Sequence, residues 1–460
     1  MTRSSNTHGS PRNDGNQHNG SSHDRGNAGD SLRALLAPTI DTRGNLREII
    51  LIPLAAVFMA LLIGALIMMA TSVEPHIILR SFVAMADGSV GSLNAISETL
   101  TASIPLVLAG LGIGLAFRAG LFNIGAEGQM VGGGLMAAVV SFSVTGLPMA
   151  LHLPLVLVSG LLVGGLYAAI AGFLRAATGA HEVISTIMLN LISIRLLDYL
   201  LRQPFIQKEG RSDPISKAVL ETAELPRLLS FIDPNLRLHF GLFLMLGAVI
   251  LIYWLLYRSK LGFAFRISGE NPDAARYAGI RAGLTIVIAM AIAGGRAGLA
   301  GAAQVTGVLG RATPGFTAGI GFDAIAVALL GRSHPVGILL AGVLFGALEA
   351  GGRQMQVDAG VSIDMISIIQ ALIIIFVAAP LLVKRIMPFL FADRPKEDAD
   401  HGCPDTNGSG PAGSITAGGE CHRLAAHHQR LYAGHAGGHR PVFAGCTMGQ
   451  RVNIPDFPSA

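Results

Sequence analysis

Charged residues are scarce in this sequence. Asp, Glu, Lys and Arg make up 13% of it and hydrophobic residues 51%, whereas soluble domains typically carry about 25% charged residues. A soluble globular domain is therefore excluded, and the composition is typical of a polytopic membrane protein. Aromatic residues are also few, at 6%, and no basic stripe with interleaved aromatics occurs, so we expect no nucleic-acid partner.

Cysteine is missing from the apolar part of the sequence. Cys403, Cys421 and Cys446 all lie in a polar C-terminal segment. Neither a disulfide framework nor thiol chemistry is therefore indicated for the apolar part. The spacing of cysteine and histidine in that segment matches no tetrahedral zinc template, so we expect no metal site.

Motifs for nucleotide binding and hydrolysis are missing as well. The dipeptide Gly-Lys of a P-loop occurs nowhere, so the chain has no ATP site of that type. His181 and Glu182 lack the second histidine of a metalloprotease motif. We expect no catalytic residues, no cofactor of the chain's own and no enzyme activity.

Long apolar runs are what the sequence does contain. A run of about 20 residues crosses the hydrocarbon core of a bilayer, and these runs predict an all-α polytopic membrane domain over 46–386 with about ten transmembrane helices. The tails 1–45 and 387–460 are rich in small and polar residues, so we expect them to be disordered. The expected spans are 48–71, 98–118, 121–144, 152–174, 183–203, 238–257, 284–309, 321–332, 335–352 and 361–383.

Basic residues predict the orientation. The segment 258–283 contains five basic residues and only two acidic ones, so the positive-inside bias places it in the cytoplasm. The basic residues are Arg258, Lys260, Arg266, Arg276 and Arg281. An even number of spans then puts both termini in the cytoplasm. The long segment 204–237 is predicted to be an external loop, which either receives a binding protein or serves as a solvated connector.

The cytoplasmic segment carries the signals of a short helix. Asn271 is a good N-cap, Pro272 suits the first helical turn, and Asp273 is favourable at the positive end of a helix. These residues predict a helix over 272–277 that stops at Gly279. A capped helix between two spans is suited to contact a partner outside the membrane, with Tyr277 as its largest exposed anchor.

Polar side chains inside the expected spans are few, and each is costly in a bilayer unless it faces a cavity or a partner. Glycine also interrupts the third span and brackets the short eighth span, as in helices that break near a transport site. Close packing through small residues is the alternative explanation for these glycines. Structural roles are the alternative for the polar side chains, and Glu127 and Glu182 can instead organise loops. We assign five residues to a substrate pathway: Asn123, Glu127, Gln129, Asn190 and Asp323.

Four stretches, 117–129, 182–190, 269–280 and 321–332, carry a resemblance to a known family. They resemble the permeases of ABC importers of the branched-chain amino acid and simple-sugar class, and among these the nucleoside and simple-sugar permeases. The resemblance implies a type II ABC importer-like permease fold with 258–283 as its cytoplasmic coupling loop. The residues it implies for ATPase coupling are Glu270, Asn271, Pro272, Ala274, Ala275, Tyr277 and Gly279.

The same resemblance implies a permease subunit in a bacterial plasma membrane that moves a nucleoside or simple sugar inward. Its expected partners are a separate ABC ATPase subunit that uses the ATP, a second permease subunit that is identical or different, an extracytoplasmic solute-binding protein, and membrane lipid. Branched-chain amino acids are the alternative solutes. An ion-coupled secondary transporter is the alternative mechanism, but it has less reason to present the helix 272–277.

Two residues depart from the family pattern. His181 stands where the resemblance implies asparagine, and Arg296 stands in the Gly/Ala-rich run 293–303, where a small uncharged residue is expected. An arginine that faces the pathway would favour an anionic or strongly polar solute. An arginine that extends to the cytoplasmic end of its span would have no such role.

Overall fold

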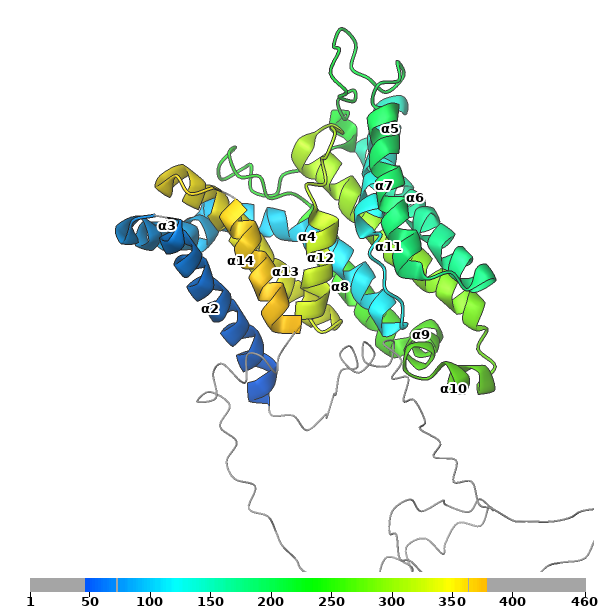
Figure 1. Cartoon of the computed structure of the whole chain (residues 1–460). Coiled ribbons are helices and arrows are strands. Elements are labelled where there is room, and N and C mark those ends of the chain that lie inside the picture. Colours follow the sequence, from blue (N-terminus) through cyan, green and yellow to red (C-terminus); the bar gives the residue numbers. More distant parts are fainter. Residues whose placement is uncertain (1–45, 72, 363, 379–460) are drawn as a thin grey trace, which may run out of the picture. The chain divides into compact units, whose positions relative to one another are not determined.

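The computed structural model describes residues 46–71, 73–362 and 364–378, which belong to one unit (Figure 1). This part of the chain is helical and forms no strand, in agreement with the predicted all-α class. The tails that we predict to be disordered, together with all three cysteines, lie outside the described residues.

Each of the predicted spans overlaps a helix. Within the described residues, six helices are long and apolar enough to cross a membrane, namely α4, α6, α7, α8, α11 with its C-terminal extension, and α13. The total of ten spans and the side of the termini stay predictions. The ten helices that overlap spans are α2 (Leu46–Ala70), α4 (Leu93–Arg118), α5 (Ala126–Ser143), α6 (Met149–Thr178), α7 (Glu182–Leu200), α8 (Gly241–Arg258), α11 (Ala282–Gln304), α12 (Ile320–Leu330), α13 (Pro335–Ala359) and α14 (Asp364–Ala378).

Two further helices were not predicted. α3 (Pro75–Val90) runs crosswise to α2 in Figure 1 and packs on α13 and α4. α9 (Lys260–Glu270) occupies the first part of the basic segment 258–283, ahead of the predicted α10 (Pro272–Tyr277). Ser259 caps α9 by accepting the N–H of Gly262 at 3.0 Å, and Phe265 is fully buried. Both helices bury one face against longer neighbours.

α4 is the central helix of the unit. Of its most apolar stretch, 83% is buried within the chain, compared with 28% for α6. It contacts α13, α11, α12 and α8, so other helices surround α4, whereas α6 exposes a broad apolar surface. A peripheral apolar surface of that kind is expected where helices face lipid.

Glycines allow α6 and α11 to approach closely. A side chain added at Gly298 would place its Cβ 2.3 Å from the carbonyl oxygen of Gly160, and one at Gly164 would lie 2.5 Å from that of Gly294. In α5, a Cβ at Gly133 would lie 2.3 Å from the Cα of Gly298. These positions show close packing through small residues, which was one of the two interpretations proposed for Gly133.

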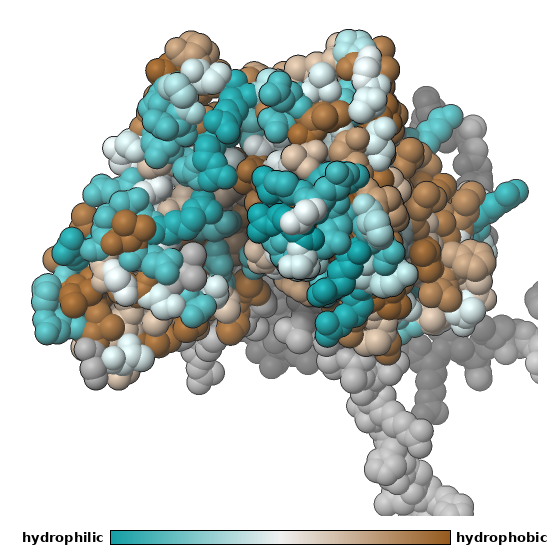
Figure 2. Space-filling view, turned by 90° about the horizontal axis from the view of Figure 1, so that it is seen from above, coloured by the Kyte–Doolittle hydropathy of each residue, from teal (hydrophilic) through white to brown (hydrophobic). Residues whose placement is uncertain are grey.

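The predicted external loop is packed onto the end of α11. The backbone N–H groups of Ser216, Val219 and Leu225 donate to the carbonyl oxygens of Ala312, Gly310 and Thr306 at 3.0, 2.9 and 3.1 Å. Val219 and Leu225 are also buried, so this part of the segment packs against the helices. Seen from above, hydrophilic residues gather over the middle of this face and hydrophobic residues lie along its margins (Figure 2).

Candidate transport site

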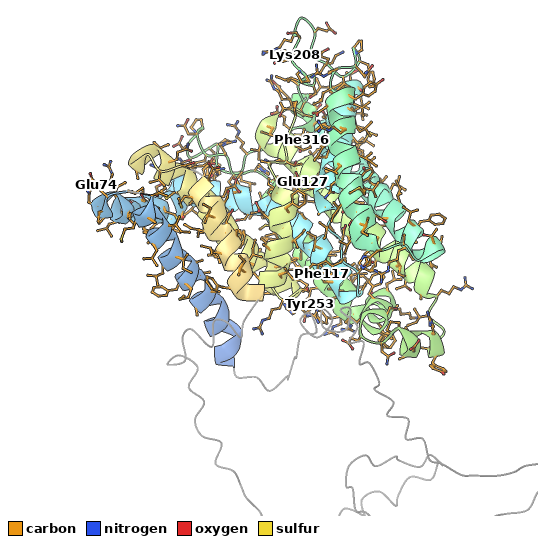
Figure 3. The ribbon with its side chains drawn as sticks, viewed as in Figure 1. Glu74, Phe117, Glu127, Lys208, Tyr253 and Phe316 are labelled. Carbon is orange, nitrogen blue, oxygen red and sulfur yellow. The ribbon has the colours of Figure 1, made fainter. Side chains whose placement is uncertain are left out.

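Two helices begin inside the helical unit instead of at its ends. α5 was predicted from residue 121, but residues 120–125 are not helical and the helix starts at Ala126. α12 begins at Ile320 after Gly319, which has a φ of 83° that glycine adopts without strain. In Figure 3, Glu127 of the first turn of α5 lies between Phe316, near the end that carries Lys208, and Phe117, near the opposite end.

The carboxylate of Glu127 connects these two helix starts. It accepts a short hydrogen bond from the hydroxyl of Thr317, and the N–H groups of Gly319 and Gly321 at 3.3 and 2.8 Å. The side chain is 4% exposed. A carboxylate is favoured at the positive N-terminal end of a helix, so Glu127 stabilises the start of α12 while it belongs to α5.

Gly321 makes this contact possible. A Cβ at that position would lie 2.4 Å from both the N and Cα atoms of Glu127. Because backbone atoms cannot move aside cheaply, any other residue would separate α12 from α5.

The other predicted amides complete the start of α5. Asn123 and Gln129 exchange two side-chain hydrogen bonds, at 3.0 and 2.9 Å, and fix the non-helical stretch to the helix that follows. Asn190 of α7 accepts the N–H of Gly128 at 2.9 Å and donates to the carbonyl oxygen of Ile124 at 2.9 Å. Asn190 thereby satisfies an N–H of the first helical turn, which has no partner within the helix.

The structure thus brings four of the five predicted pathway residues together. Asn123, Glu127, Gln129 and Asn190 are all buried and hydrogen-bonded within the chain. Asp323, one turn into α12, takes no part in these hydrogen bonds and is half-buried. Contact of any of them with a solute stays a prediction.

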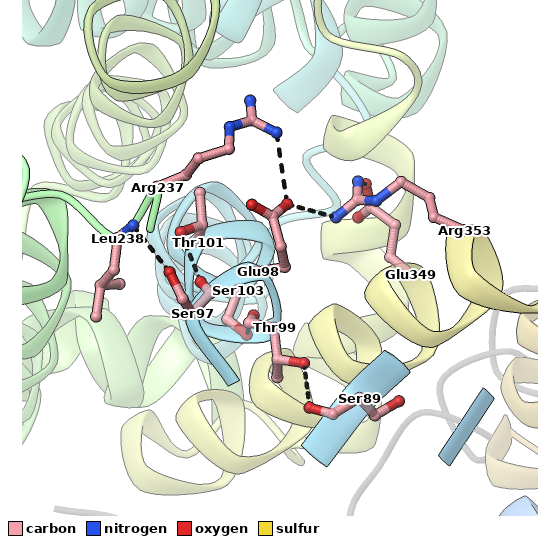
Figure 4. A network of polar contacts seen from close by, with 10 residues as sticks. All are labelled: Ser89, Ser97, Glu98, Thr99, Thr101, Ser103, Arg237, Leu238, Glu349 and Arg353. Atoms are coloured by element: carbon pink, nitrogen blue, oxygen red, sulfur yellow. Dashed lines mark hydrogen bonds and ion pairs between the residues drawn. The ribbon is translucent and has the colours of Figure 1, made fainter. Parts of the chain in front are cut away.

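Two further polar clusters contain pairings that sequence reasoning did not predict. Glu182 pairs with Arg175 and accepts the N–H of Phe122 at 3.3 Å, so it organises a loop, which was one of the roles considered for it. Glu98 of α4 pairs with Arg237 of the external loop at 3.5 Å and with Arg353 of α13 at 3.4 Å (Figure 4). The residues of each cluster are far apart in sequence, which hides their pairing.

The predicted helix over 272–277 is confirmed. Asn271 accepts the N–H groups of Asp273 and Ala274 at 3.1 and 3.0 Å, Pro272 occupies the first turn, and Gly279 follows with a φ of 75°. Tyr277 is 94% exposed. Of the residues assigned to ATPase coupling, Ala275 alone is buried within the chain; the exposed ones are Glu270, Asn271, Pro272, Ala274, Tyr277 and Gly279.

Apolar helices that surround a polar core, with two helices that start inside the bundle, define a polytopic membrane transport protein. Its family is the branched-chain amino acid transport system permease component family, whose model matches residues 95–378, and the chain belongs to it. Members are permease components, so the chain is not itself an enzyme.

The relatives are ABC transporter permeases. The guanosine ABC transporter permease of Bacillus subtilis (strain 168) is 36% identical over 74% of this chain and 95% of its own length. A nucleoside ABC transporter permease of Lactococcus lactis subsp. cremoris (strain MG1363) is 33% identical over 74% and 93%. A glucose ABC transporter permease of Haloferax volcanii is 34% identical over 75% and 92%. No solved structure matches the chain significantly.

Proposed function

We propose that this chain is the membrane-spanning permease subunit of an ATP-driven ABC importer that moves a nucleoside or simple sugar into the cell. The observation that carries this proposal is the similarity, over nine-tenths of their length, to nucleoside and glucose ABC transporter permeases. The capped surface helix α10 supports it, because a transporter driven by a separate ATPase needs a surface through which that ATPase acts.

The connection of α9 and α10 to the transport site supports the same mechanism. The two helices join the end of α8 to the start of α11. A Cβ at Gly269 of α9 would lie 2.4 Å from the carbonyl oxygen of Arg118 and 2.8 Å from the N atom of Gly120. Gly120 directly precedes the non-helical stretch that leads to Glu127, so a displacement of α9 acts on the start of α5.

The exposed surface of α10 is the proposed ATPase contact. Tyr277 and Ala274 face outward, and Asp273 pairs with Arg276 at 3.2 Å on the same surface. The buried Ala275 instead holds α10 against the chain. An exposed ring beside a small residue suits a groove on a partner subunit, as in other helix-in-groove contacts.

The remaining assignments follow from this role. We infer ten spans with both termini cytoplasmic in a bacterial plasma membrane, a type II ABC importer-like permease fold, a second permease subunit, and a solute-binding protein that docks outside. The ATPase uses the ATP, and the permease needs no cofactor. The polar core around Glu127 keeps the broken helices in register, and Asp323 is the one predicted pathway residue that is not fully buried, so we expect it to meet a solute.

Transport assays test the proposed function. Vesicles that contain the full complex should take up labelled guanosine, uridine or glucose when ATP is supplied to the ATPase side, and uptake should stop when ATP is depleted. A protonophore and a sodium ionophore should leave ATP-driven uptake unchanged. Uptake that persists without ATP under an ion gradient would identify a secondary transporter and exclude the importer.

A further inference from the structure

Arg296 is a buried cation without a partner in the described part of the chain. It lies on α11, is 8% exposed, and has no hydrogen bond or ion pair to any described residue. Burial of an unpaired charge is strongly unfavourable, and arginine inside a membrane protein normally faces a partner or a cavity. The Cβ of Arg296 also lies close to Gly112 of the central helix α4, which leaves no space for the side chain on that side.

The side chain of Arg296 lines a groove along α8. The groove has a volume of about 360 Å³, within the range of about 300–1,000 Å³ for small-molecule sites. Arg296 is the only polar residue among those that line it. The others recur on one face of α8, and they are Phe240, Phe243, Leu244, Gly247, Ala248 and Leu251.

We propose that this groove binds the base of a purine nucleoside with an oxygen at position 6, such as guanosine or inosine. The inference rests on the proposed function and selects one of its two solute classes. The phenyl rings of Phe240 and Phe243 are about half exposed and can stack on a planar base. The guanidinium of Arg296 can donate two hydrogen bonds to the O6 and N7 acceptors on one edge of such a base.

The apolar residues that line the groove make a sugar an unfavourable ligand for it. A hexose or pentose presents many hydroxyl groups, each of which needs a hydrogen-bonding partner when it is desolvated. The groove offers one polar side chain among six apolar residues, so most of those hydroxyl groups would stay unpaired. A 6-oxopurine base leaves fewer polar groups unpaired, because its faces are apolar, its O6 and N7 acceptors can meet Arg296, and its N1 edge and ribose can remain outside the groove.

The position of the groove allows ATP hydrolysis to act on it. Arg296 of α11 reaches the groove along α8, and these two helices are the ones that α9 and α10 join. A movement of α10 therefore changes the separation of α8 and α11, and with it the fit of the groove around a base. A site between these helices binds and releases its solute as the ATPase cycles.

Exchange of Arg296 for glutamine provides a test that a structural role would not mimic. Glutamine forms its bidentate pair with the N6 and N7 atoms of adenine. Arg296→Gln should therefore reduce guanosine uptake roughly tenfold or more, and raise adenosine uptake relative to guanosine. Competition between labelled guanosine and unlabelled guanosine, inosine, adenosine, uridine or glucose, in vesicles that contain the complete transporter, measures this preference.

Matched variants separate this effect from a loss of assembly. Arg195→Met removes an arginine from the exposed surface of α7, and Phe173→Leu changes an exposed ring on α6; both should leave the order of solutes unchanged. Arg296→Met should still copurify with the ATPase but lose the preference for 6-oxopurines.

Wild-type nucleoside uptake that depends on ATP, with no change of preference in Arg296→Gln, would overturn the purine site and leave the importer intact. Wild-type uptake of glucose but not nucleosides would also overturn it.

Discussion

Glu127 holds the broken helices together through one carboxylate. Its two oxygens accept hydrogen bonds from Thr317, Gly319 and Gly321, and the group lies at the N-terminal end of α12. In a transporter, such half-helix starts leave backbone groups available near the solute path. Glu127, which the sequence assigned to the pathway, therefore holds the start of α12 against α5, and this role is compatible with a solute that passes beside it.

Replacement of Glu127 by glutamine should weaken this junction. The amide nitrogen of glutamine is a donor, so it would oppose one of the donors that the carboxylate now accepts and leave it unpaired. The expected loss is about 1–3 kcal/mol of stability, with lower uptake. Thermal unfolding of the purified complex in detergent measures the first effect. Glu224→Gln, in the exposed part of the external loop, is the control and should have the stability of the wild type.

The sequence identified most residues of the polar core but not their partners. Asn123, Glu127, Gln129 and Asn190 stood out because amides and carboxylates are rare in apolar spans. Thr317 did not, since a hydroxyl in a polar stretch gives no such signal, and 190 residues separate it from Glu127. Which side chains meet depends on where α12 starts relative to α5, and one sequence does not contain that information.

At the level of helices, local sequence signals predicted a helix correctly where its capping residues alone mark its start and end. The cap at Asn271 and the proline after it predicted α10 with correct bounds. α3 and α9 were missed because neither contains a long apolar run, and each is stabilised by one buried face against its neighbours. In α3 the buried positions recur at helical spacing, for example Ile78, Ser81 and Met85.

The exposed face of α10 permits a direct test of coupling. Ala274→Asp should place a charge in the proposed contact with the ATPase, where desolvation without a partner is strongly unfavourable. Copurification of the ATPase should fall, and transport should fall with it, while solute binding to the extracytoplasmic protein stays unchanged. Ala177→Asp, at an exposed position near the end of α6, adds the same charge outside α10 and should have no effect. Equal retention of the ATPase by both variants would argue against the contact.

At the scale of the whole described unit, the predicted external loop and the helices α9 and α10 occupy opposite ends (Figures 1 and 3). The loop is held to α4 and α13 by the pairs of Glu98 with Arg237 and Arg353. α9 and α10 contact the other ends of α4 and α11. The charge distribution agrees with this separation, since basic residues outnumber acidic ones in 258–283, as expected of a cytoplasmic segment.

Single cysteines at the two ends test the orientation of the unit. In a chain whose three native cysteines are replaced by serine, Ser212→Cys in the external loop should react with an impermeant thiol reagent added to intact cells. Ala278→Cys, directly after α10, should react only after the membrane is permeabilised. Both positions are exposed, so a difference in labelling reports sidedness and not burial. Labelling of both cysteines in intact cells would place the loop and α10 on the same side of the membrane. An even number of spans would then separate them, whereas the ten-span arrangement has a single crossing there, by α8. The ten-span arrangement would be wrong.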